Sequence, residues 1–307
     1  MRITTSMVQR NVLADLNTLS SKLAKTQSKA SSGKEIERPS DNPYQTARAL
    51  GLRQTIAAND QYKSNIEDAQ GWQDATETTL SSITDYVNRA QSLLLEGSSD
   101  SADATARASV ADEIDQIIQG LKDSANASFG DRYLMSGTAT STPPYKQGDD
   151  DAYQGNEAGL DPTIPGVIRE IGPGVTISIN SVGREILGDG RANPTDGKLL
   201  NTLRDISEHL RANDGPALRG GDGAALKSAM DSVLQVRSRN GAMTNRLEAA
   251  GSRIDQIQGA VQQQLTDTED VDIAKTIIEF NSQSAAYQAS LRAGANIVQS
   301  SLMDFLK

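Results

Sequence analysis

The chain contains no cysteine and a single histidine, His209. These absences exclude disulfide bonds, thiol catalysis, zinc-finger spacings and histidine-based catalytic triads. They leave the redox compartment open, although a cysteine-free chain suits a protein that crosses from a reducing to an oxidising space.

Aromatic side chains and long apolar runs are also scarce. Phe, Trp and Tyr make up 4% of the 307 residues, and the mean hydropathy is −0.48. No apolar run approaches transmembrane length, and the first residues lack the hydrophobic stretch of a signal peptide. We therefore expect a thin aliphatic core between long helices and, for an exported chain, secretion without the usual cleaved signal.

The charge balance is acidic. The chain carries 40 acidic and 30 basic residues, for a net charge of −10. This balance argues against nucleic acid and against an anionic membrane surface as partners.

A long helix is predicted near the C-terminus, and the chain is organised around it. Its start is expected at the capping-box spacing Thr266-Asp-Thr-Glu269. Apolar or small residues recur at steps of three and four, which indicates one narrow stripe on a helix. The stripe consists of Ile277, Phe280, Ser284, Tyr287, Leu291, Ala295, Val298, Leu302 and Phe305. Such a helix needs partner helices, because so thin a stripe does not support an isolated helix.

A second thin-striped helix is predicted over residues 5–31. Val12, Leu16, Leu19 and Leu23 recur with coiled-coil spacing. The two ends of the chain thus carry complementary helices that each lack a partner. We therefore predict that the two stripes together form the self-assembly seam.

The middle of the chain alternates between helical and non-helical patterns. Helical spacing predicts a helix over 44–96 and a third one that carries Val110 to Ala125 and ends near Gly130. It also predicts a helix over 199–210 and a long helix after a glycine-rich turn at 215–223. Between them, Val167–Ile171, Gly172-Pro-Gly174 and Val175–Ile179 are typical of a β-hairpin. The fold class is mainly α: a long antiparallel helical bundle or coiled coil with discontinuous, nested domains and a small β-rich insertion.

This nesting suggests three domains. Residues 1–44 and 266–307 would form a terminal coiled-coil domain, and residues 45–140 and 194–265 a helical rod domain. Residues 141–193 would form a β-rich outer insertion.

Motifs that could carry catalysis or bind a metal are weak. Asp149-Asp-Asp151 lacks the spacing and glycine of a calcium loop, and a solvated loop is the better interpretation. Asp270 and Asp272 are expected to serve the helix dipole. His209 has no partner motif, and Trp72 is more often packing than a binding platform. The sequence therefore predicts a protein that is not an enzyme and that has no catalytic residue, bound cofactor or metal ion.

Several motifs together resemble the bacterial flagellins and their relatives at the hook–filament junction. Ser31-Ser-Gly33 followed by Arg38-Pro-Ser-Asp-Asn-Pro43 looks like the junction version of the first connector, with Arg38, Pro39, Ser40, Asp41 and Pro43 as its characteristic residues. The segments Arg132–Thr138, Asn240–Glu248, Asp270–Ala274 and Ser301–Leu306 are similar to further family segments.

The resemblance implies a structural subunit of the extracellular bacterial flagellum. Its implied partners are identical subunits in a ring, the first hook-associated protein on one side and flagellin on the other. It also implies type III export, with a chaperone on the C-terminal helix, and terminal helices that pair on assembly. A minor flagellin remains an alternative, although Pro39 and Pro43 speak against it, and an intracellular coiled-coil adaptor is a further one.

Overall fold

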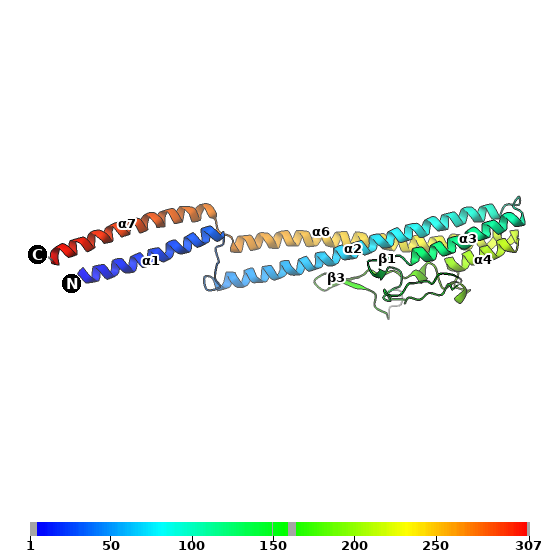
Figure 1. Ribbon diagram of the computed structural model, residues 1–307, viewed down its shortest axis with the longest axis horizontal. Coiled ribbons are helices and arrows are strands. Elements are labelled where there is room, and N and C mark those ends of the chain that lie inside the picture. The colour runs from blue at the N-terminus through cyan, green and yellow to red at the C-terminus, as the bar shows by residue number, and fades with distance from the viewer. Residues whose placement is uncertain (1–4, 149, 159–163, 306–307) are drawn as a thin grey trace. The chain divides into compact units, whose positions relative to one another are not determined.

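The computed structural model describes the backbone of residues 5–148, 150–158 and 164–305 (Figure 1); within its helices, the side chains of residues 5, 6, 8, 9 and 296–305 are not described. The predicted mainly α fold is confirmed. The main helices are α1 (Thr5–Ser32), α2 (Pro43–Gly97), α3 (Ala104–Ala125), α4 (Leu199–Arg211), α6 (Gly223–Glu269) and α7 (Ile273–Phe305). The strands are β1 (Ser128–Phe129), β2 (Arg132–Tyr133), β3 (Ile168–Gly172) and β4 (Val175–Ser178).

Two compact units make up the chain. Unit 1 contains residues 1–58 and 257–307, and unit 2 contains residues 59–256. The division falls within α2, after residue 58, and within α6, after residue 256. The three-domain division expected from the sequence stays a prediction.

In unit 1, helices α1 and α7 lie antiparallel. Thr26 Oγ1 on α1 donates to Gln283 Oε1 on α7 at 2.9 Å. Nearer the chain ends, a Cβ on Gly294 would lie 3.1 Å from a methyl carbon of Val12. The lack of a side chain at Gly294 therefore permits a close approach of the two helices.

The predicted start of the C-terminal helix is wrong. Residues 266–269 form the last turn of α6, and α7 begins at Ile273. The Asp272 carboxylate caps α7 by accepting from the Lys275 backbone N–H at 3.1 Å. Glu269 is buried instead of lying at a helix start, because it forms an ion pair with Arg53 at 2.8 Å.

Unit 2 contains the hydrophobic core. Helices α2 and α6 are antiparallel here, as the ion pairs Lys63–Asp255 and Arg237–Glu77 show. The core also takes in residues from α3, α4 and the β-rich segment. Its fully buried members include Leu80, Ile83, Ile114, Ile118, Leu121, Leu134, Met135, Ile179, Ile186, Leu203, Leu226 and Leu247.

The glycine-rich segment after α4 is not the turn that its composition suggests. It continues as a short helix, α5 (Gly215–Ala217), and a π-helical turn, η3 (Leu218–Asp222), that lead directly into α6. Asp214 caps the first turn through the Ala217 backbone N–H, and Pro216 sits where its missing N–H costs nothing. Burial of Leu218 favours the helical path over a loop.

The β-rich segment contains the predicted hairpin. Strands β3 and β4 pair antiparallel, with Arg169 opposite Ile177. Ile177 and Ile179 are buried as expected, whereas Val175 is exposed beside the turn. A second small hairpin pairs β1 with β2, with Phe129 opposite Arg132. Its Phe129 ring packs on Gly71 and meets the buried Trp72 edge-on at 6.3 Å.

Candidate functional site

One of the acidic residues expected in a solvated loop is buried. Asp151 is 2% exposed and accepts two hydrogen bonds from the Arg204 guanidinium, at 3.0 and 3.1 Å. The Lys122 ammonium, which is fully buried, lies 2.5 Å from the same carboxylate. The interpretation of Asp151 as a solvated residue was therefore wrong, because two cations from α3 and α4 compensate its burial.

The Lys122 ammonium has an acceptor for each of its three N–H groups. Besides Asp151 it donates to the carbonyl oxygens of Gly148 at 2.6 Å and Asp150 at 3.1 Å. Burial raises the pKa of Asp151, but the hydrogen bonds from Arg204 and Lys122 outweigh it and hold that pKa below its usual value. The cluster is a satisfied structural network that fixes Gly148, Asp150 and Asp151 on α3 and α4.

His209 also has a partner that its sequence neighbourhood does not reveal. Its Nδ1 lies 2.8 Å from a carboxylate oxygen of Asp222 in η3. This hydrogen bond raises the pKa of His209, and the charges of Asp222, Asp214 and Asp205 act in the same direction. The pair connects the last turn of α4 to the end of η3, directly before α6.

Neither a metal-binding cluster nor a membrane-spanning helix is present in the part of the chain that the structure describes. No group of three or more His, Cys, Asp or Glu side chains there is arranged to hold a metal ion. In the same part, no helix is long and apolar enough to cross a membrane.

The connector residues singled out from the sequence form a turn between α1 and α2. The Asp41 backbone N–H donates to the Arg38 carbonyl at 2.9 Å, and Lys25 on α1 bonds the Asp41 carboxylate at 2.9 Å. This bond holds the pKa of Asp41 below its usual value. Pro43 is the first residue of α2, and Pro39 and Ser40 are the exposed central residues of the turn.

The N-terminal part of the predicted seam lies along one face of α1. Val12, Leu16, Leu19 and Leu23 are all half-buried, and the contact of Gly294 with Val12 places this face against α7.

The C-terminal part of the seam is divided between two faces of α7. Phe280 and Tyr287 are half-buried, but Ile277 is 49% and Leu291 is 45% exposed. Val298, Leu302 and Phe305 lie within α7, with side chains outside the described residues. Ile277 and Leu291 are thus the most exposed members of the predicted seam whose side chains the structure describes.

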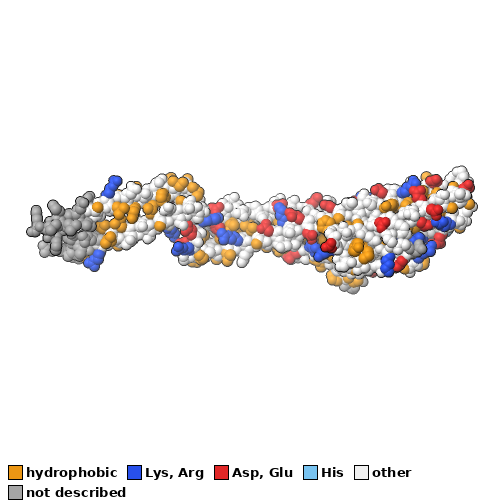
Figure 2. All heavy atoms as spheres, in the orientation of Figure 1, with side chains coloured by type: hydrophobic (Ala, Val, Ile, Leu, Met, Phe, Trp, Pro, Cys, Tyr) orange, Lys and Arg blue, Asp and Glu red, His pale blue; other side chains and the backbone are white. Residues whose placement is uncertain are grey.

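The face of α7 that meets α1 overlaps the predicted stripe at Phe280 and Tyr287, and its other residues are small or polar. Its most withdrawn residues include Thr276, Phe280, Gln283, Tyr287, Ser290 and Gly294. Ile273 and Leu291 are 18 residues apart, about five helical turns, so they share one face with the neighbouring Ile277. All three are at least 45% exposed, and hydrophobic side chains are visible on the surface of this helix pair in Figure 2. We call Ile273, Ile277 and Leu291 the uncovered stripe.

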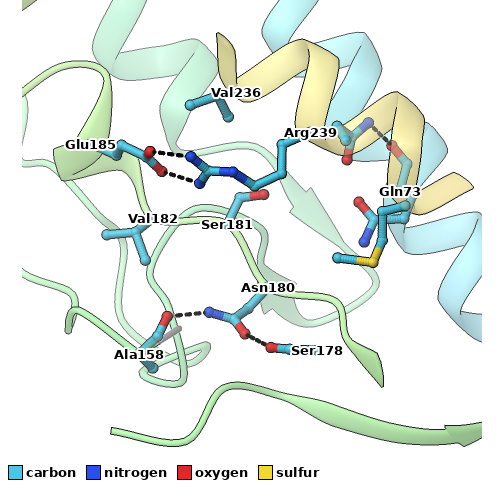
Figure 3. Close-up of a pocket in the computed structure, with 11 residues that line it drawn as sticks. Gln73, Ala158, Ser178, Asn180, Ser181, Val182, Glu185, Val236 and Arg239 are labelled. Carbon is cyan, nitrogen blue, oxygen red and sulfur yellow. Dashed lines mark hydrogen bonds and ion pairs between the residues drawn. The ribbon is translucent and has the colours of Figure 1, made fainter. Parts of the chain in front are cut away.

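Unit 2 contains a cavity of about 120 Å³ between α2, α6 and the segment that follows β4 (Figure 3). Its lining is largely amide, hydroxyl and apolar, and it includes a paired Arg239 and Glu185.

Comparisons with known proteins agree with this architecture. Residues 3–140 match the bacterial flagellin N-terminal helical region, and residues 224–306 match the bacterial flagellin C-terminal helical region. Flagellar hook-associated protein 3 of Escherichia coli strain K12 is 27% identical over the full length of both chains. Flagellin of Bacillus subtilis strain 168 also aligns over both full lengths at 27% identity, as a weaker match.

A solved structure has the same fold. The putative flagellar hook-associated protein from Vibrio parahaemolyticus superposes with a TM-score of 0.61 at 21% identity, over 75% of this chain and 100% of that one. The chain belongs to the flagellin-like family of flagellar structural proteins. Within that family it is a protein of the hook–filament junction.

Proposed function

We propose that this chain joins the hook to the filament by packing its terminal helices against those of neighbouring subunits. The observation that carries the proposal is the uncovered stripe of α7. Within the described part of α7, helix α1 packs on one side, and Ile273, Ile277 and Leu291 beside that contact are at least 45% exposed. Covering about 45% of a leucine or isoleucine side chain is worth on the order of 1 kcal/mol each. Repeated around a ring of identical subunits, such contacts favour assembly over the free monomer.

The same stripe supports the other proposed partners. As a junction protein the chain would contact the first hook-associated protein on one side and flagellin on the other. Exposed aliphatic side chains promote non-specific association. An export chaperone that covers α7 before type III secretion would prevent this association inside the cell. The proposed final location is the extracellular flagellum.

A matched pair of leucines tests this function. Leu291 on α7 and Leu234 on α6 are each 45% exposed, but Leu234 lies in unit 2. We expect Leu291→Asp and Leu234→Asp to leave the thermal unfolding of the monomer unchanged within about 0.5 kcal/mol. In a strain that lacks its own copy, Leu234→Asp should restore swimming and Leu291→Asp should not, because a buried unpaired carboxylate disfavours assembly. Normal swimming with Leu291→Asp would refute the role of the stripe.

The full-length similarity to Bacillus subtilis flagellin is the one observation on the side of the minor-flagellin alternative, and it is a weaker match than the hook-associated protein. A filament subunit and a junction subunit would use the same terminal helices. They differ in where the protein lies along the flagellum, which is a direct measurement.

A further inference from the structure

The cavity in unit 2 contains a buried acceptor that the described residues leave unbonded. Asn240 on α6 is 6% exposed and lines the cavity. Its side-chain Nδ2 donates to the Gln73 carbonyl at 3.2 Å. Its Oδ1 has no hydrogen-bond partner among the residues that the structure describes. One half of this amide is thus satisfied and the other half is not.

An unsatisfied buried acceptor is unusual in a folded protein. The large majority of buried side-chain polar atoms have a partner, from the chain or from ordered water. Because the Asn240 amide is anchored through Nδ2 to α2, its Oδ1 has a set direction. The cavity beside it leaves room for a donor that does not belong to the chain.

The lining determines which chemistry fits. Arg239 and Glu185 face each other in a two-pronged ion pair at 3.0 and 2.9 Å, as Figure 3 shows. Their charges cancel, so the wall favours neither an anion nor a cation. Val236 and Met243 add apolar surface, and Asn180 is already occupied by bonds to the Ala158 carbonyl and to Ser178.

The cavity volume of about 120 Å³ is too small for a nucleotide or a sugar, but it accommodates a few water molecules. We propose that this cavity binds a compact neutral hydrogen-bond donor at Asn240 Oδ1, supplied by water or by the amide of a small solute. The bound donor fills the space between α6 and the segment after β4.

Crystals of the full chain, grown without and with acetamide, test the proposal. We expect electron density at about 2.7–3.2 Å from Asn240 Oδ1. A peak that acetamide leaves unchanged assigns the donor to water, and a peak that acetamide replaces assigns it to a solute amide. Asn240→Leu, which keeps the size but removes the acceptor, should lose the peak, while the control Met243→Leu should keep it.

Two results would overturn the proposal. One is an empty cavity around Asn240 Oδ1, and the other is a side chain of this chain or of a neighbouring copy bonded to that atom. If the fluorescence of Trp72 shows that Asn240→Leu does not fold, the proposal is tested on the wild-type protein by nuclear magnetic resonance. Magnetisation transfer from water, or from added acetamide, to the Asn240 side-chain amide is expected, and its absence for both counts against the proposal.

Discussion

The buried charge cluster of unit 2 allows a stability prediction with a known magnitude. Asp151→Asn keeps the size of the side chain but removes the charge that compensates Lys122 and Arg204. Lys122 is fully buried, so its ammonium would retain only the carbonyl oxygens of Gly148 and Asp150 as close partners. Breaking a buried ion pair by removing one partner costs about 3–5 kcal/mol.

This loss of unfolding free energy is measurable by urea unfolding, and the matching fall in melting temperature by thermal unfolding, both followed through the fluorescence of Trp72. This residue is the chain's single tryptophan and is buried in α2 within unit 2. At 2–4 °C per kcal/mol for a unit of this size, the melting temperature should fall by about 6–20 °C. The control is Asp150→Asn, whose side chain is 49% exposed beside Lys146 and should cost less than about 1 kcal/mol. A loss below about 1 kcal/mol for Asp151→Asn would show that the cluster does not hold the fold as described.

The pH dependence of the same variant follows from linkage. The pKa of Asp151 is lower in the folded chain than in the unfolded one. Its contribution to stability is therefore present above the unfolded pKa of about 3.9 and is lost as the pH falls through the folded pKa. The difference in unfolding free energy between wild type and Asp151→Asn should shrink on acidification below about pH 4. A constant difference across this range would contradict the assignment.

Further predictions concern the glycines and the histidine. Gly97→Ala should destabilise unit 2 by about 1–3 kcal/mol in urea unfolding, since its Cβ would lie 2.4 Å from a methyl carbon of the buried Leu210. Gly259→Ala should instead stabilise α6 by up to about 1 kcal/mol, because a Cβ there meets open space inside a helix. His209→Gln should remove a pH-dependent contribution to the free energy of unfolding, because the hydrogen bond with Asp222 raises the pKa of His209 in the folded chain. This contribution is present below the unfolded pKa of about 6.5 and is lost as the pH rises through the folded pKa. Stability profiles of wild type and variant that stay parallel from pH 5 to 9 would refute this.

The sequence correctly predicted elements that depend on interactions between residues close together in the chain, such as α1 and the β3–β4 hairpin. The coiled-coil spacing of Val12 to Leu23 predicted the face of α1 that turns to α7. The run Gly172-Pro-Gly174 predicted the hairpin, because a turn and its flanking strands are encoded within a dozen residues.

Long-range partners decided the features that the sequence missed. Nothing near Asp151 in the sequence reveals Lys122 or Arg204, so its burial could not be foreseen. Glycine content alone favoured a turn at 215–223, although the cap at Asp214 and Pro216 in the first turn were signals for a helix. The apolar stripe of α7 predicted a contact face, but which part of it α1 covers depends on the partner helix. The interaction of Ile277 and Leu291 with other subunits stays a prediction.

The central claim is that this chain occupies the boundary between hook and filament. Gold labelling of the protein on flagella isolated from its own bacterium measures this most directly. We expect label at one point of each flagellum, between the curved hook and the first filament subunits. Label distributed along the filament would contradict the account and would make the chain a minor flagellin.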